Sequence, residues 1–385
     1  MRGAAGGVNG PPLSGGAGAR PVSSARPTSC CLGCVAAAAL LGAATTLLLI
    51  GLGVGGPGFL VGAVVACLPA PIYVALALWL DRYEPEPPLY LLAAFLWGAG
   101  GAIFLAFVGN TFDEALLTVF LGSSQANVAG AVLSAPLVEE AAKGAFLLLL
   151  YVFASDEFDD IVDGVIYATM VALGFAMTEN IQYYGNAFAK EGFGGLAATA
   201  LLRGILAPYS HPLFTCMTGV GFGWARQSDR KIVKFLAPAG GLLAAMTLHF
   251  LWNASASIHG GLWLLAYVFI MMPTAVALMA VVYFSLRREG RLLHHYLAPE
   301  VEAGRLEPAD YRGLQSMLAR IRKGFSSLWT GGPSAWIAYE RYASAASELA
   351  FLRHRVVHEA LDADQFRPRE ANLIEQMRML RQGFR

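Results

Sequence analysis

Charged residues are scarce in this sequence and unevenly placed. Only 14% of the 385 residues are Asp, Glu, Lys or Arg, whereas 56% are hydrophobic and the mean hydropathy is positive. This balance excludes an ordinary soluble domain and predicts a polytopic membrane protein. The net charge is zero, but 16 of the 27 Lys and Arg residues follow residue 286. The sequence therefore predicts an apolar bundle followed by a water-exposed tail.

The sequence also lacks a cysteine framework. Its five cysteines are an odd number, and Cys67 and Cys216 lie inside apolar segments, so no disulfide set is implied. Cys30, Cys31 and Cys34 precede the first apolar run, without a second Cys or His group at metal-ligand spacing. We interpret these three as small residues next to the membrane.

Long apolar runs dominate the chain instead. A spanning helix needs about 20 mostly apolar residues. Eight runs meet this requirement, at residues 35–53, 58–80, 89–109, 127–153, 161–186, 198–225, 234–257 and 262–286. We therefore expect an all-α polytopic membrane protein with about eight transmembrane helices, in which the stretch 111–126 is an amphipathic or re-entrant piece on the outer side.

Three regions follow from this pattern. Residues 1–29 are expected to form a disordered arm, residues 30–286 a transmembrane helical domain, and residues 287–385 a mainly helical cytosolic region. Lys and Arg concentrate in the segments that would face the cytoplasm if both termini lie there. The expected location is the plasma membrane, with a multi-pass topology.

Ionisable side chains are nearly absent from the eight runs and are confined to four consecutive ones. They are Glu139, Glu140, Lys143, Asp163, Glu179, Arg203, His211 and His249. A charged group at the bilayer centre costs about 2.5–3.5 kcal/mol on insertion scales, so such groups must face one another or a watery cavity. The sequence predicts one shared polar cavity. Asp163 is the exception, because its position at the start of a run indicates a helix-terminal carboxylate.

The residue types in this cavity suit hydrolysis. A glutamate can take a proton from water, while a histidine and an amide can donate to a developing oxyanion. Glu139 and Glu140 share a run with Lys143, and His249 and Asn253 fall on one helix face at i, i+4. The set fits hydrolysis of a carbonyl compound inside the membrane. The spacing does not say which glutamate is the base.

Five stretches in order resemble the PrsW family of intramembrane proteases, which is related to the CAAX-protease and bacteriocin-processing group. They are DRYEPEPP (81–88), EEAAK (139–143), DGVIYATMVALGFAMTEN (163–180), SHPLF (210–214) and HFLWN (249–253). The resemblance implies an intramembrane endopeptidase that cuts membrane-anchored proteins, for example an anti-sigma factor. It places catalytic positions at Glu139, Glu140, Glu179, His211, His249 and Asn253. Glu179 stands where the CAAX relatives often have His, so the partner that activates water stays open between His211 and Glu179.

The cofactor is a second open point. The resemblance includes a frequent metalloprotease label, and Glu139, Glu140, Glu179, His211 and His249 could supply mixed oxygen and nitrogen ligands to a divalent ion such as zinc. No HExxH motif is present, and we favour a metal-free glutamate mechanism over a metal.

Other function classes remain alternatives. The expected partners are a membrane-anchored protein substrate and the lipid bilayer, with no nucleic acid. A proton-coupled small-molecule transporter is the main alternative, because intramembrane Glu, His and Lys also form proton relays. Against it, the runs show no obvious internal repeat. A catalytically inactive membrane scaffold is the third possibility.

Overall fold

A computed structural model gives the structure of this chain and describes residues 26–384 except 82, 84, 156, 259 and 360–362. Every regular element in this described part is helical, which confirms the all-α class. The α-helices are α1 (Arg26–Val54), α2 (Gly56–Cys67), α3 (Ala70–Leu80), α4 (Pro88–Leu96), α5 (Ile103–Leu121), α6 (Ser123–Ala129), α7 (Ala135–Phe153), α8 (Ile161–Ala200), α9 (Ser210–Arg226), α10 (Lys231–Ile258), α11 (Gly260–Ala266), α12 (Met272–Glu302), α13 (Pro308–Leu314), α14 (Met317–Glu359) and α15 (Ala363–Leu380). Four π-helical segments continue them, namely η1 (Trp97–Ala102), η2 (Gly130–Ser134), η3 (Leu201–Leu206) and η4 (Tyr267–Met271), and a 3-10 turn, η5 (Arg381–Gly383), follows α15.

Among the described residues, six helical segments are long and apolar enough to cross a membrane. They are Gly33–Val54, Gly56–Leu80, Pro88–Leu121, Ile161–Arg226, Lys231–Ile258 and Gly260–Glu302. The predicted count of eight is not confirmed. The expected run 127–153 is missing from this set, because its helix α7 carries three charged residues. The segment Ile161–Arg226 counts once, although its chain bends at Gly192 (φ 65°) and leaves helical geometry between η3 and α9.

Three boundaries differ from the sequence expectation. Helix α1 begins at Arg26, inside the expected arm, and residues 1–25 lie outside the described part of the chain. Helix α5 continues to Leu121, where Gly122 (φ 79°) ends it, so 111–121 is a helical extension rather than a separate piece. Helix α12 passes through 287 to Glu302, because the Arg-rich sequence there changes polarity without losing helix propensity.

Close backbone contacts hold the central helices together. A Cβ atom added at Gly219 of α9 would lie 2.1 Å from the carbonyl oxygen of Gly164 on α8. A Cβ atom added at Gly221 would lie 2.4 Å from the carbonyl oxygen of Ala237 on α10. Only glycine permits such approaches, because any side chain would have to displace backbone. Helix α9 is therefore fixed between α8 and α10, which brings their polar side chains together.

The start of α8 shows why one carboxylate stands apart. Asp163 accepts hydrogen bonds from the backbone N–H groups of Asp159 (2.8 Å) and Asp160 (2.9 Å). Asp160 in turn caps the helix by accepting from the N–H groups of Val162 and Asp163. This capping box agrees with the interpretation of Asp163 as a helix-terminal carboxylate.

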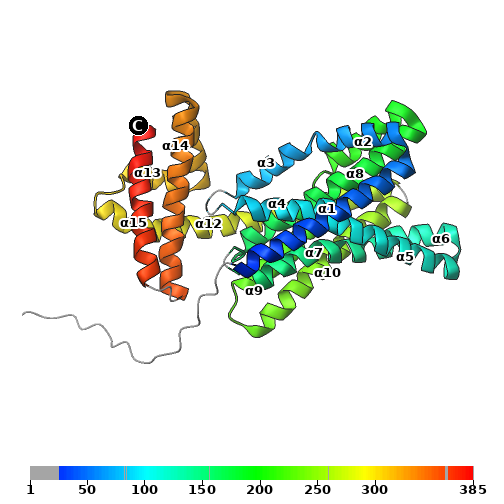
Figure 1. Ribbon diagram of the computed structural model, residues 1–385, viewed down its shortest axis with the longest axis horizontal. Coiled ribbons are helices and arrows are strands. Elements are labelled where there is room, and N and C mark those ends of the chain that lie inside the picture. The colour runs from blue at the N-terminus through cyan, green and yellow to red at the C-terminus, as the bar shows by residue number, and fades with distance from the viewer. Residues whose placement is uncertain are drawn as a thin grey trace, which may run out of the picture.

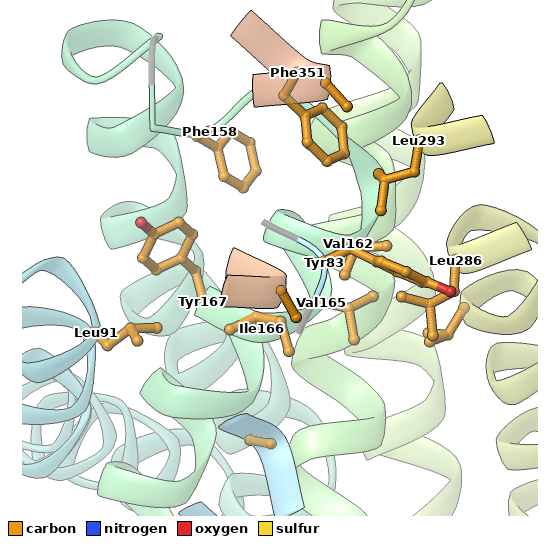
Figure 2. Close-up of a cluster of buried hydrophobic side chains, with 14 of the residues drawn as sticks. Tyr83, Leu91, Phe158, Val162, Val165, Ile166, Tyr167, Leu286, Leu293 and Phe351 are labelled. Atoms are coloured by element: carbon orange, nitrogen blue, oxygen red, sulfur yellow. The ribbon is translucent and has the colours of Figure 1, made fainter. Parts of the chain in front are cut away.

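Helices α13, α14 and α15 lie at one end of the bundle, and α12 connects them to it (Figure 1). One cluster of buried hydrophobic side chains continues from the bundle into these helices, and it includes Tyr83, Phe158, Leu293 and Phe351 (Figure 2). The Arg320 guanidinium of α14 lies 5.8 Å from the centre of the Tyr83 ring. The connection between α3 and α4 is therefore covered by the C-terminal helices.

Candidate active site

The buried ionisable side chains come together in one cluster. Helix α7 supplies two glutamates and a lysine, α8 a glutamate, η3 an arginine, and α9 and α10 one histidine each. Five of these side chains are buried, with exposed fractions of 6% for Glu139, 0% for Glu140, 0% for Lys143, 7% for His211 and 3% for His249. Residues from Glu139 to His249 in the sequence therefore meet in one enclosed region of the bundle.

Glu140 is the most completely paired of the carboxylates. Its Oε1 atom accepts hydrogen bonds from the Lys143 ammonium (2.8 Å) and from His249 Nδ1 (3.0 Å). Its Oε2 atom accepts one from the Thr215 hydroxyl (2.9 Å). Charge-assisted hydrogen bonds of this kind are the strong ones in proteins. Glu140 thus ties α7 to both α9 and α10.

His211 is held between two charged groups. Lys143 donates to His211 Nδ1 at 3.0 Å, and His211 Nε2 lies 3.0 Å from Glu179 Oε2. Because an ammonium group can only donate, Nδ1 must accept and the ring proton resides on Nε2, where it is donated to Glu179. Glu179 is also paired with the Arg203 guanidinium, which donates from Nε to Asn180 Oδ1 at 2.6 Å.

Glu139 differs from its neighbour in having an unsatisfied oxygen. Its buried Oε2 atom has no hydrogen-bond partner among the described residues. The nearest basic atoms are Lys143 Nζ at 3.5 Å and His249 Nε2 at 4.0 Å. The second distance is too long for a direct hydrogen bond. A buried carboxylate oxygen without a partner is costly, which makes Glu139 the exceptional member of the cluster.

A polar cavity of about 410 Å³ adjoins the cluster. Glu139, Glu179, His211, His249 and Asn253 all line it, so the structure brings five of the six predicted site residues to one cavity. The sixth, Glu140, lies behind them in the protein interior. The Asn253 amide donates one hydrogen bond to the carbonyl oxygen of Ala131 in η2 (2.8 Å), which leaves it one further N–H.

Comparison with known proteins supports this grouping. The profile of a family described as PrsW family intramembrane metalloprotease matches residues 86–279, which are 194 of the 385 residues. The chain belongs to the PrsW family. The matched range contains the four motif stretches between Glu139 and Asn253 and every element of the polar cavity that holds an ionisable cluster residue. No solved structure matches the chain.

Several curated PrsW relatives, each named Protease PrsW, match the same chain. One from Geobacillus kaustophilus is 36% identical over 151 residues, which are 39% of this chain and 60% of the relative. One from Bacillus subtilis is 30% identical over 162 residues (40% and 65%), and one from Clostridioides difficile is 34% identical over 139 residues (36% and 55%). The chain therefore covers less than two thirds of the length of each of these relatives.

The PrsW family description names a metal, and three residues could hold one. Glu139, His211 and His249 each offer a ligand atom, and these atoms lie within 4.8 Å of one another. Two histidines and a glutamate also match the composition of catalytic zinc sites. However, both nitrogens of His211 are hydrogen-bonded, and Lys143 uses the lone pair of one of them. In this arrangement Glu139 and His249 Nε2 are available as ligand atoms, whereas His211 Nδ1 could bind a metal only if Lys143 released it.

Three residues that bond to the cluster were not among the six predicted site residues, namely Lys143, Arg203 and Thr215, although the sequence placed Lys143 and Arg203 among the groups that face the shared cavity. Arg203 pairs with Glu179, a partner indicated by the rule that an arginine inside an apolar run needs a carboxylate. Thr215 follows His211 by four residues on α9, so both lie on one helix face. This i, i+4 spacing is the one sequence signal for Thr215, and it is weak, because a threonine in a membrane helix usually bonds to its own backbone.

Proposed function

We propose that this PrsW-family chain is an intramembrane endopeptidase that hydrolyses peptide bonds of membrane-anchored proteins with water activated by Glu139. The observation that carries the proposal is the buried Oε2 atom of Glu139, which has no hydrogen-bond partner in the described part of the chain, on a residue that lines the polar cavity. General base catalysis requires a basic group that lies within reach of the proton it removes and is not already engaged in other hydrogen bonds. The names of the relatives, Protease PrsW, support the reaction class.

Charge counting favours the same glutamate. The cluster contains three carboxylates, at Glu139, Glu140 and Glu179, and two cations, at Lys143 and Arg203. Lys143 is closest to Glu140, and Arg203 pairs with Glu179, so the uncompensated charge falls on Glu139. One added proton neutralises the cluster, and Glu139 and His249 are the two sites facing each other across 4.0 Å that can share it. The cluster is therefore arranged to move a single proton.

The proposed reaction uses that proton exchange. A water in the polar cavity beside Glu139 and His249 gives a proton to the Glu139 carboxylate as its oxygen attacks the peptide carbonyl carbon. The oxyanion that forms accepts hydrogen bonds from protonated His249 Nε2 and from the second amide hydrogen of Asn253. When the C–N bond breaks, Glu139 returns the proton to the leaving amine. No step in this scheme is assigned to a metal.

The remaining polar residues act as positioning groups. Glu140 fixes the His249 ring through Nδ1, which leaves Nε2 directed at Glu139. Lys143 and Glu179 hold His211 between them, and Arg203 holds Glu179. In this scheme the water-activating partner left open by the sequence is neither His211 nor Glu179. It is Glu139 acting with His249.

The proposal includes a topology. Two crossings by the segment Ile161–Arg226 and one by the charged helix α7 would raise the six apolar segments to eight. Arg226 donates from Nε to the carbonyl oxygen of Phe158 (2.8 Å), so two connections lie at the end of the bundle that carries the C-terminal helices. We assign this end, both termini and the region 287–385 to the cytoplasm, because Lys and Arg gather at this end. We assign the bundle of 30–286 to the plasma membrane.

The direct test compares protein N-termini in membranes from cells that express wild type or Glu139→Gln at equal abundance. The substitution keeps the shape of the side chain and removes its ability to take a proton. We expect new N-termini in membrane-anchored proteins with wild type only. Identical sets of termini under several growth stresses would refute proteolysis, and the same membranes would then be assayed for proton-coupled uptake.

A further inference from the structure

A second cavity adjoins the active site and has no part in the proposed reaction. Its volume is about 390 Å³, within the range of about 300–1,000 Å³ found for small-molecule sites. Arg203, Ser210, His211 and Trp252 line both this cavity and the polar one. The two cavities therefore adjoin each other, and these four side chains form the wall that they share.

The lining of this second cavity is mostly apolar. Small residues leave the space open, and aromatic rings bound it. The small residues are Ala66, Ala70, Ala176, Gly204, Ala207 and Gly260, and the aromatic residues are Tyr73, Trp252 and Trp263. Most polar side chains lie on the wall shared with the active site and at the neighbouring Asn180. The Tyr73 hydroxyl and the Trp263 indole also line the cavity, and the Tyr73 hydroxyl is bonded to the Gly204 carbonyl oxygen. An occupant with an apolar part and hydrogen-bonding groups at one side would match this distribution.

Two tyrosines fix the segment that separates the cavities. The Tyr73 hydroxyl of α3 donates to the carbonyl oxygen of Gly204, and the Tyr267 hydroxyl of η4 donates to that of Leu206 at 3.0 Å. Both carbonyls belong to η3, the π-helical segment that carries Arg203. π-helical turns often occur at functional sites. The cavity is thus preformed, with its wall held from two neighbouring elements.

We propose that this cavity is the subsite for a bulky apolar side chain, of the leucine or phenylalanine class, next to the peptide bond that is cleaved. The inference rests on the proposed protease function. In an extended chain, successive side chains point in opposite directions, so one can fill the apolar cavity while the neighbouring carbonyl lies in the polar one. A polypeptide is favoured over a lipid tail, because this cavity shares Arg203, Ser210 and His211 with the polar cavity, where a peptide carbonyl would lie and an acyl chain offers no polar group.

Filling the cavity from the side away from the active site tests this subsite. Ala70 lies on α3, a helix without ionisable cluster residues, so Ala70→Val, Ala70→Leu and Ala70→Phe reduce the space in steps. Ala75→Phe on the same helix is the matched control, because Ala75 is exposed and lines a separate shallow surface hollow. New N-termini in membranes from each strain are compared with those from Glu139→Gln.

The expected result is a change in preference. In wild type, one fixed position beside the cleaved bond should be rich in Leu, Phe, Met or Ile. The ratio of bulky to small residues there should fall stepwise in the Ala70 series, by about tenfold or more for Ala70→Phe, while Ala75→Phe leaves it unchanged. The Ala70→Val variant provides the result if the larger substitutions prevent accumulation of the protein.

Two different failures are distinguishable. If Glu139-dependent termini appear and the Ala70 series leaves the residue preference unchanged, or lowers all termini in parallel, the subsite is refuted and the protease function stands. If a lipid tail fills the cavity, the Ala70 series shows this same unchanged preference. If no termini depend on Glu139, the protease function fails and this inference fails with it.

Discussion

The two adjacent glutamates should fail in different ways when each is replaced by glutamine. Glu140→Gln removes the charge that faces Lys143 and His249, and its new amide group cannot accept from three donors as the carboxylate does. Glu139→Gln removes a carboxylate whose Oε2 atom lacks a hydrogen-bond partner among the residues that the structure describes. We therefore expect a loss of fold stability from Glu140→Gln and a loss of catalysis without a loss of stability from Glu139→Gln.

The structure sets the size of both effects. Breaking a fully buried ion pair by removing one partner costs about 3–5 kcal/mol, and both Glu140 and Lys143 are 0% exposed. Glu139→Gln should change the stability by less than about 1 kcal/mol, because its only close cation is already paired with Glu140. Loss of a general base should lower cleavage by about 10²–10⁴-fold.

Thermal unfolding of the purified variants in detergent, with N-terminal profiling of membranes, measures both quantities. A double-mutant cycle sharpens the result, since Glu140→Gln/Lys143→Met should be less destabilised than the sum of the two single variants. Equal losses of stability for Glu139→Gln and Glu140→Gln would refute the assignment of the uncompensated charge. A destabilised Glu139→Gln that still cleaves would refute its role as the base.

Three further outcomes are expected. The chelator 1,10-phenanthroline should leave Glu139-dependent cleavage unchanged, and a loss restored by zinc would replace the proposed scheme with a metal-dependent one. Gly219→Ala should lower the unfolding temperature, at a cost of about 1–3 kcal/mol, because its Cβ would meet the Gly164 carbonyl, while the control Gly240→Ala, with open space around it, should not. Burial raises the pKa of Asp81, outside the spans, to about 7 from 3.8. Its stabilising contribution is therefore complete below about pH 3.8 and lost as the pH rises through about 7, so Asp81→Asn should flatten the pH profile of the unfolding midpoint across that window.

The all-α class and the polar cavity could be predicted because polar groups in hydrocarbon must be paired. For the backbone this requires helices, and for side chains it requires a shared polar site. Charged groups in hydrocarbon must meet, so their occurrence on four consecutive runs places Glu139, His211 and His249 near one another without knowledge of the fold. The bonding pattern could not be predicted in the same way. Whether Lys143 pairs with Glu139 or Glu140 depends on side-chain directions, and both lie one helical turn away.

Helix boundaries were less predictable than the cavity. Hydropathy marks where a segment stops being apolar, whereas a helix ends only where the backbone changes, as at Gly122 and Gly192. Helix α12 shows the difference, because it keeps its hydrogen bonds through a polar stretch that hydropathy interprets as the end of a span. Hydropathy averages do not distinguish π-helical from α-helical segments, although the π-helical segment η3 carries Arg203.

In the proposed mechanism, the cost of burying charge explains why only one of the three glutamates acts as the base. Each ionised group taken out of water must recover its lost hydration from bonds inside the protein. Glu140 does so through three donors, and Glu179 through Arg203 and His211. Glu139 is also a buried glutamate, but its Oε2 atom lacks such bonds among the described residues. Taking a proton from water therefore removes an uncompensated charge at Glu139, whereas it would break existing hydrogen bonds at Glu140 or Glu179. The proposed base is thus set apart because the neighbouring carboxylates are already bonded. Arg203→Met removes the cation that pairs with Glu179, so a second carboxylate would compete for the proton, and we expect this variant to lower cleavage rather than raise it.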